Sequence, residues 1–298
     1  MPPLDAYISD QDLDQLLTVA QFEDLGPANL DATSALFIDE HTTAEAKVVA
    51  REPGTVAGLA LLPAIIERYD STITLQSVAV DGARVEPGDA VAVFNGPLRS
   101  VLMLERVALN FLGHLSGVAT HTAAFADRIA YTSAKVYDTR KTLPGLRGLQ
   151  KYAVACGGGG THRMGLYDAV LVKDNHLAHV PLDEWTNALR AMAERARSEI
   201  AGLKFVMVEV DTLEQLAQVL PAGVDLVLLD NMPPDILRQA VAMRDQAAPD
   251  VQLEASGGVT LESVVAIAES GVDRISVGAL THSSINLDLG LDIEPVSS

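Results

Sequence analysis

Apolar positions recur at helical spacing near the start of the chain and then give way to short strand-like runs. Residues 11–25 form an amphipathic helical pattern that ends at the breaker pair Gly26-Pro27. Between residues 44 and 98, β-branched runs are separated by Pro-Gly and Asp-Gly turn pairs, with one helical segment at residues 57–69. The pattern predicts a small α+β domain in the first third of the chain.

A long apolar helical stretch and then an alternation of strands and helices occupy the remainder. Residues 102–129 predict one or two long helices that connect two domains. Strands that alternate with helices predict a parallel sheet. Six apolar, β-branched runs separated by helical segments begin at residues 134, 168, 204, 224, 251 and 273.

This parallel sheet can close in two ways. One is a (β/α) barrel, which is incomplete if the six visible strands are all that it has; the other is an open, doubly wound sheet. The strand spacings are fairly regular, and no G-x-G-x-x-G motif follows the first strand. Both observations favour the barrel.

The composition agrees with an α/β protein and indicates a compartment. With 48% hydrophobic and only 4% aromatic residues, the core must be built from Ala, Val, Leu and Ile, as is usual for parallel strands. No apolar run approaches the length of a membrane span, and the first residues are acidic where a signal peptide is basic. The single cysteine, Cys156, excludes an intramolecular disulfide and a cysteine-based zinc cluster, with a reactive thiol as an alternative role. We therefore expect a cytoplasmic protein.

Positive charge is concentrated in one segment of an acidic chain. The 298 residues have a formal net charge of −19, but residues 135–176 carry +4 and the rest therefore −23. A local positive island predicts a pocket for a small anion and argues against nucleic acid, which requires an extended basic surface. Arg147 and Lys151 fit a solvated helix face equally well. The stronger candidates, whose flanks are not helical, are Arg140, Lys141, Arg163 and Lys173.

Polar residues close each predicted strand at its C-terminal end. In a parallel barrel these ends converge on one mouth, where active sites are found. Two of the residues, Asp211 and Asn231, are interpreted as helix caps. The full set is Asp138 and Arg140, Lys173 and Asp174, Glu209 and Asp211, Asp230 and Asn231, Glu254 and Ser256, and Gly278.

The last strand ends add small residues whose backbone N–H groups could approach a phosphate. These lie at residues 256–258 and 277–280. Glu209 and Asp230 are hard oxygen donors that suit Mg²⁺, which keeps much of its water and bridges to phosphate oxygens. Arginine suits carboxylates through paired hydrogen bonds. The predicted site therefore takes two polyanions, one phosphorylated and metal-bound and the other a carboxylate.

Several blocks of this chain resemble the quinolinate phosphoribosyltransferase family (carboxylating nicotinate-nucleotide pyrophosphorylase). In chain order they are EDLG, ERVALNFLGHLSGVAT, DTRKTLPGLRGLQKYAV, GGGGTHRMGLYDAVLVKDNH, VEVD, VLLDN, ASGG and SVGALTHS. The resemblance spans nearly the whole chain. The block HRMGLYDAVLVKDNH is its most specific part, and Thr161 stands where many relatives have Asn.

The resemblance implies a fold and a reaction. The fold is an N-terminal α/β sandwich domain, residues 1–117, and an incomplete (β/α) barrel, residues 118–280, of the type II phosphoribosyltransferase kind, with residues 281–298 returning to the first domain. The reaction converts quinolinate and phosphoribosyl pyrophosphate to nicotinate mononucleotide, pyrophosphate and CO₂ in NAD biosynthesis, with Mg²⁺ as cofactor. The pyridine nitrogen is the nucleophile, so no nucleophilic side chain is required.

The resemblance also implies residue roles. Arg140, Arg163 and Lys173 would hold the quinolinate carboxylates, with Thr139 and His162 nearby. The catalytic residues would be Lys141, Glu209 and Asp230, which serve phosphoribosyl pyrophosphate and its metal. Arg106 would reach quinolinate in a neighbouring subunit, so a homodimer or larger homo-oligomer is implied. The backbone phosphate contacts would be Ser256, Gly257, Gly258, Val277, Gly278 and Ala279.

Three other functions stay open at this stage. A paralogue on the same scaffold would use a different anionic acceptor. A Schiff-base aldolase would use Lys141 or Lys173. A metabolite-binding regulator would lack chemistry, but no DNA-reading module is present. The acidic phosphoribosyl-pyrophosphate loop of other transferases is absent, which excludes their fold and not their chemistry.

Overall fold

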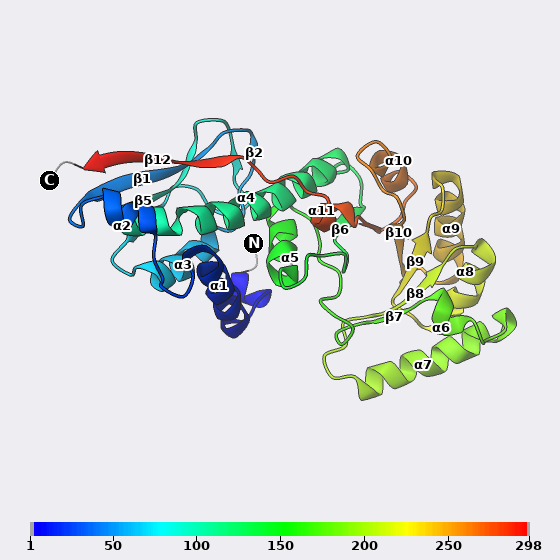
Figure 1. Cartoon of the computed structure of the whole chain (residues 1–298). Helices are drawn as coiled ribbons and strands as arrows, with labels where there is room; N and C mark the ends of the chain where they lie inside the picture. The colour runs from blue at the N-terminus through cyan, green and yellow to red at the C-terminus, as the bar shows by residue number, and fades with distance from the viewer. Residues whose placement is uncertain (1–2, 297–298) are drawn as a thin grey trace. The chain divides into compact units, whose positions relative to one another are not determined.

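The computed structural model describes residues 3–296 and divides the chain into two compact units (Figure 1). Unit 1 contains the described residues up to 123, residues 143–158, and those from 281 onward. Unit 2 contains residues 124–142 and 159–280. In sequence, unit 2 therefore lies between segments of unit 1, and residues 143–158 of unit 1 divide it in two.

An antiparallel sheet of four strands organises unit 1. Its strand order is β12-β1-β5-β3, and the last strand pairs with β1 along its full length, from Thr43 opposite Val296 to Ala50 opposite Leu289. The C-terminal segment is thus an edge strand of the first unit's sheet. The elements are α1 (Asp10–Leu25), α2 (Ala32–Phe37), β1 (Thr43–Ala50), β2 (Gly54–Thr55), α3 (Leu62–Tyr69), β3 (Thr74–Ser77), β4 (Arg84–Val85), β5 (Ala90–Pro97), α5 (Arg147–Cys156) and β12 (Leu289–Val296). Two further helices have residues in both units: α4 (Leu98–Arg128) and α11 (Ala279–His282).

The predicted long connecting stretch is one 31-residue helix, α4. By length and composition alone it could cross a membrane, contrary to the expectation from the sequence. However, 61% of its most apolar window is buried inside the structure, and the core helix of a globular protein passes the same test. Leu104, Leu112 and Leu115 on this helix are almost completely buried. Packing against unit 1 therefore accounts for its apolar character.

Helix α5 lies in unit 1, although its residues follow the first strand of unit 2 in sequence. Gln150 is fully buried and joins separate segments: its side-chain amide donates to the Thr281 carbonyl at 2.8 Å and accepts from the Leu143 N–H at 2.9 Å. Lys151 is also fully buried. The alternative of a solvated helix face is therefore wrong for Lys151.

Cys156 ends α5 and is a buried free thiol. Burial, together with the nearby negative charge of Asp81, raises the pKa of this thiol to about 12. Because the thiolate is the reactive form, a reactive-cysteine role is not supported. We expect native protein to react with a thiol-specific disulfide reagent at pH 8 far more slowly than urea-unfolded protein does. Equal rates would contradict this expectation.

Unit 2 is built on six parallel strands in the order β6-β11-β10-β9-β8-β7. All five pairings are parallel. The strands are β6 (Lys135–Tyr137), β7 (Val170–Val172), β8 (Val206–Val210), β9 (Leu226–Asp230), β10 (Gln252–Ser256) and β11 (Arg274–Ser276). The helices are α6 (Asp174–Leu177), α7 (Trp185–Glu199), α8 (Leu213–Val219), α9 (Pro234–Ala247) and α10 (Val264–Ala268).

The winding of this sheet distinguishes between the two predicted closures. From β7 to β11 the strands follow one another in chain order, and β6 lies beside β11. A doubly wound sheet would reverse direction at a switch point, which this order lacks. Within residues 3–296 no ladder joins β6 to β7, so the barrel is incomplete. The predicted fold class is confirmed.

Strand register divides the side chains of the sheet between two faces. Met207 is paired with Leu226, and these two pack with Leu228, Leu171 and Phe205 in one apolar cluster. Because side chains alternate along a strand, this inner face also receives Glu209 and Asp230, two residues beyond Met207 and Leu228. The face that forms the apolar core at one level therefore presents charge at the strand ends.

Candidate active site

The carboxyl ends of the central strands bring several predicted site residues to one edge of the sheet. Asp230 is paired with Ser256 in the ladder between β9 and β10, so both side chains lie on the inner face. Lys173 follows β7 directly, and its ammonium forms an ion pair with the Glu209 carboxylate. The Asp230 carboxylate accepts a hydrogen bond of 2.8 Å from the Asn231 side-chain amide. The sheet register thus groups Lys173, Glu209, Asp230 and Ser256.

The loop after β6 carries the next predicted residues. Asp138 is fully buried, and its Oδ1 accepts the His162 backbone N–H at 2.7 Å. The Thr139 hydroxyl accepts the Lys141 backbone N–H at 3.0 Å, which fixes the turn between them. Lys141 itself is exposed at the strand end. This loop is therefore tied to the His162 segment by a buried carboxylate.

Arg163 and Arg140 lie close enough to repel each other. Arg163 is 6% exposed, and its Nη1 donates to the Ala169 carbonyl at 3.0 Å. Burial and the neighbouring positive charge of Arg140 lower the pKa of Arg163, with Asp168 opposing them. Two guanidinium groups placed together in this way favour the binding of an anion.

Asp168 holds the loop that follows Arg163. Its carboxylate accepts the backbone N–H groups of Met164 at 2.8 Å and Gly165 at 3.0 Å, and forms an ion pair of 2.9 Å with Lys204. Sequence reasoning counted Asp168 only as a charge. Its position five residues after Arg163, at the start of a run that predicts a strand, was the available signal for an anchoring role.

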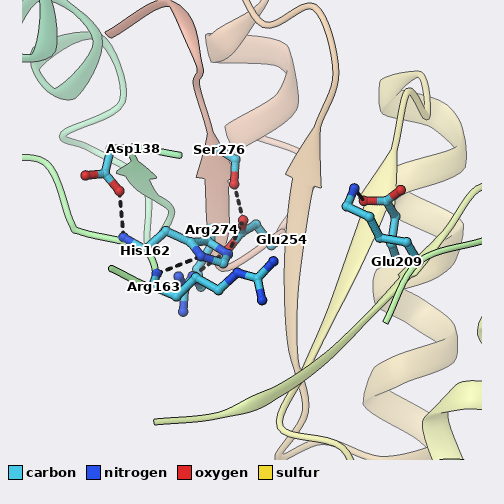
Figure 2. Close-up of polar contacts among 8 residues, drawn as sticks. Asp138, His162, Arg163, Glu209, Glu254, Arg274 and Ser276 are labelled. Atoms are coloured by element: carbon cyan, nitrogen blue, oxygen red, sulfur yellow. Dashed lines mark hydrogen bonds and ion pairs between the residues drawn. The ribbon is translucent and has the colours of Figure 1, made fainter. Parts of the chain in front are cut away.

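The sequence predicted that Glu254 lies at the mouth of the barrel, but the structure places it one layer deeper. It is the third residue of β10, fully buried, and its Oε2 lies 2.7 Å from Nε of Arg274 on β11. Its Oε1 accepts a hydrogen bond from the Ser276 hydroxyl and lies 3.4 Å from His162 Nε2 (Figure 2). Sequence reasoning missed Arg274 and Ser276. Glu254 and Arg274 lie directly opposite each other in the ladder between β10 and β11, and this register places the two charges together.

The buried carboxylates predict a dependence of stability on acid. Burial alone would raise the pKa of Glu254, but hydrogen bonds from His162 and Ser276 and the charge of Arg274 lower it. For Asp168, burial is likewise outweighed by the Gly165 and Met164 hydrogen bonds and by Lys204, which lower its pKa. A carboxyl with a depressed pKa in the folded state stabilises the fold above its unfolded pKa, roughly 4, and this contribution is lost as pH falls through the folded pKa.

We therefore expect the melting temperature to fall as the pH is lowered from about 5 to 3, through the usual carboxyl range. Circular dichroism melts at a series of pH values would measure it. An Asp168→Asn variant is less stable at pH 7 and has a shallower pH dependence, because one titrating group has been removed. A variant with the same slope as the unchanged protein would show that Asp168 does not contribute.

The two predicted phosphate loops, residues 256–258 and 277–280, differ in whether their backbone N–H groups are already used within the protein. Gly257 and Gly258 have φ of 101° and 56°, and a Cβ on Gly257 would lie 2.1 Å from Asn231 Oδ1. In the described part of the chain, neither glycine N–H donates a hydrogen bond. The Val277 N–H, in contrast, donates to the Tyr137 carbonyl at 2.9 Å and is engaged in the sheet. The Val277 N–H of the predicted second loop is therefore already used by the sheet.

The two strand-end residues interpreted as helix caps, Asp211 and Asn231, do not cap helices in the structure. The cap of α8 is Thr212, whose hydroxyl accepts the Gln215 N–H, and not Asp211. Helix α9 begins after Pro233. Asn231 instead has a φ of 54° and donates its backbone N–H to the Ser256 carbonyl at 2.8 Å. Asn231 thus joins the end of β9 to the Gly257 turn.

Family models match both parts of the chain. The N-terminal domain of quinolinate phosphoribosyl transferase matches residues 31–116, and the C-terminal domain matches residues 118–292. The chain belongs to the quinolinate phosphoribosyltransferase family. This confirms the resemblance inferred from the sequence motifs.

Individual relatives of the chain agree with this family. A carboxylating nicotinate-nucleotide pyrophosphorylase of Mycobacterium leprae is 44% identical over 268 residues, 89% of this chain and 91% of the relative. A probable enzyme of the same name from Bacillus subtilis is 37% identical and covers 94% of this chain and 93% of its own. The solved structure of the Francisella tularensis nicotinate-nucleotide pyrophosphorylase has a TM-score of 0.88 at 35% identity, covering 99% of this chain and 100% of that one.

Arg106 is the one predicted site residue that lies in unit 1. It is on α4, and its side chain is 65% exposed, with the Glu105 carboxylate 3.9 Å away. The other predicted residues all lie in unit 2. Arg106 is therefore a solvent-facing cation, as a residue that contacts another subunit would be, but its role stays a prediction.

Proposed function

We propose that the strand ends of unit 2 bind quinolinate and phosphoribosyl pyrophosphate and convert them to nicotinate mononucleotide, pyrophosphate and CO₂ for NAD biosynthesis. The observations that carry this proposal are the positive charge of Arg140 acting on the buried Arg163, and the Glu209 and Asp230 carboxylates at the carboxyl ends of β8 and β9. An anion-binding pair and a carboxylate pair together suit one carboxylated and one metal-bound substrate. The named relatives favour quinolinate over a different anionic acceptor.

The quinolinate half of the site consists of cations. Arg163 is held by its contact with Ala169, so its guanidinium is pre-organised before substrate arrives. Arg140 and Lys173 would complete the binding of the two carboxylates. Thr139 and His162 would lie beside them through the tight backbone contacts of their loops. Lys173 must leave its ion pair with Glu209 to contact quinolinate.

The phosphoribosyl pyrophosphate half combines carboxylates, a lysine and backbone donors. Glu209 and Asp230 fit Mg²⁺, which commonly binds one or two carboxylates plus water and phosphate oxygens. Among the described residues there is no group of three or more His, Cys, Asp or Glu that could hold a metal, which agrees with a site completed by water and phosphate. When bound, Mg²⁺ would neutralise pyrophosphate charge. The donors to phosphate would be Lys141, Ser256, Gly257, Gly258, Gly278 and Ala279.

The chemistry requires alignment and charge stabilisation. The pyridine nitrogen of quinolinate attacks the ribose C1 as the bond to pyrophosphate breaks, and Lys141 stabilises the charge on the leaving group. Loss of CO₂ then leaves an electron pair on the ring carbon beside the pyridinium nitrogen, and a proton from water replaces the carboxyl group. No side-chain nucleophile is involved, so the aldolase alternative, which requires a lysine imine, has no counterpart in this scheme.

Assembly and compartment are further parts of the proposal. Arg106 would contact quinolinate in a neighbouring subunit, so the active form would be at least a homodimer; its exposure supports this. We expect the enzyme to act in the cytoplasm, where a single buried thiol stays reduced.

The deciding experiment is release of labelled CO₂ from carboxyl-labelled quinolinate. Release that requires both phosphoribosyl pyrophosphate and Mg²⁺ is expected, with nicotinate mononucleotide identified by mass spectrometry. Nicotinate in place of quinolinate is the control, since it has no carboxyl group to lose beside the ring nitrogen. Release without phosphoribosyl pyrophosphate, or turnover of another anionic acceptor alone, would contradict the proposal.

A further inference from the structure

A charged cluster fills the interior of the sheet directly below the proposed quinolinate site. Glu254 is fully buried, and Arg274 and His162 are each 7% exposed. Figure 2 shows the Glu254 carboxylate among Ser276, Arg274 and the His162 ring, with Asp138 at the His162 backbone. Two buried charges are expensive to remove from water, and such pairs often add little to stability. A role other than stability is therefore worth seeking.

The hydrogen bonds of His162 define which ring nitrogen carries the proton. Nδ1 lies 2.8 Å from the Arg163 backbone N–H and must accept it, so Nδ1 carries no proton. The ring proton is therefore on Nε2, which faces the Glu254 carboxylate at 3.4 Å. Both ring nitrogens thus have partners in the protein. The ring also meets Phe205 edge to face at 5.2 Å.

Arg274 connects the same carboxylate to the loop that carries Arg140. Its guanidinium carbon lies 3.7 Å from the centre of the Tyr137 ring. Tyr137 is the last residue of β6, three residues before Arg140. The Tyr137 ring in turn fills the space where a Cβ on Gly160 would lie, 2.5 Å away. The segments that carry Arg140 and Arg163 are therefore both in contact with the buried pair of Glu254 and Arg274, or with His162 beside it.

We propose that Glu254 and Arg274 are positioning residues for the quinolinate half of the site. Glu254 holds His162 in the Nε2–H form, whose Nδ1 fixes the Arg163 backbone, while Arg274 stacks on Tyr137 and fixes the strand end before Arg140. His162 then orients its neighbour and is not a proton donor to substrate. This inference rests on the proposed function only for the identity of the anion.

The test variant removes both charges together. Glu254→Leu with Arg274→Met leaves no isolated buried charge, so the fold is kept while His162 loses its carboxylate. We expect the KM for quinolinate to rise about tenfold or more, as for other losses of an orienting partner, with the KM for phosphoribosyl pyrophosphate unchanged. Nitrogen-15 NMR of histidine-labelled protein, assigned with His162→Gln, is expected to show a single Nε2–H form in the unchanged protein and both neutral forms in the double variant.

Arg244→Gln is the matched control. Arg244 is also 7% exposed and pairs with Asp273 at 2.7 Å, but it lies on α9. We expect this control to lower the melting temperature without changing the quinolinate KM or the His162 signals. The proposal is overturned if the double variant keeps the unchanged quinolinate KM and His162 form, or if both variants shift the two KM values alike. The NMR measurement needs no substrate. A failure of this proposal is therefore distinguishable from a failure of the proposed function, which the CO₂ assay tests.

Discussion

Replacing Lys141 by alanine is expected to lower kcat by about 100-fold or more, the usual scale for losing one charge-stabilising contact in a transition state. Lys141 follows β6 at the carboxyl edge of the sheet, and its backbone is fixed by the Thr139 hydroxyl. In the proposed reaction the Lys141 charge stabilises pyrophosphate most strongly in the transition state, as the bond to ribose breaks. We therefore expect kcat to fall more than substrate affinity does. Steady-state CO₂ release with both substrates varied measures the effect.

Lys135→Ala is the matched control for this prediction. Lys135 is an exposed lysine at the opposite end of the same strand. Its removal changes the net charge equally and is expected to leave kcat unchanged. A Lys141→Ala enzyme with full turnover, or equal losses in the two variants, would refute the role assigned to Lys141.

Replacing Arg163 by lysine is expected to lower kcat/KM for quinolinate by about 100-fold, while the KM for phosphoribosyl pyrophosphate stays nearly constant. The substitution keeps a positive charge but removes the planar fork that binds a carboxylate through two hydrogen bonds. It also removes the Nη1 bond to the Ala169 carbonyl, so the remaining cation is less well oriented. Truncation of one member of a buried charged contact typically costs this much.

An exposed arginine of the same unit gives the comparison. Arg238 lies on α9 and pairs with Asp235 at the surface. Arg238→Lys should leave both KM values unchanged. If Arg163→Lys affected the two substrates equally, the residue would be acting on the whole fold and not on the carboxylated substrate.

The architecture of unit 2 was predictable because its signal is repeated. Six β-branched runs with helical spacers each coincide with a strand, and the strand ends place Lys173, Glu209 and Asp230 together as expected. Such a pattern depends on local composition and on the general rule that parallel strands present their carboxyl ends at one edge. Neither requires knowledge of individual contacts.

The interior cluster could not be found in this way. A charged residue within a strand pattern does not indicate how deep it lies, so Glu254 was assigned to the mouth although it is in the layer below. Its partner Arg274 begins β11, and only the register of two strands that are about twenty residues apart brings the charges together. Likewise, Lys151 follows helical spacing, but its burial depends on which segments cover α5.

Pairing of β12 with β1 has a consequence for biosynthesis. The sheet of unit 1 contains a strand near each end of the sequence, and the whole of unit 2 is translated between them. On the ribosome, the parallel sheet of unit 2 can therefore form before the sheet of unit 1 receives its edge strand β12. We expect ribosome-bound intermediates in which β1 is already paired with β5 to keep its other edge unpaired until residues 289–296 emerge.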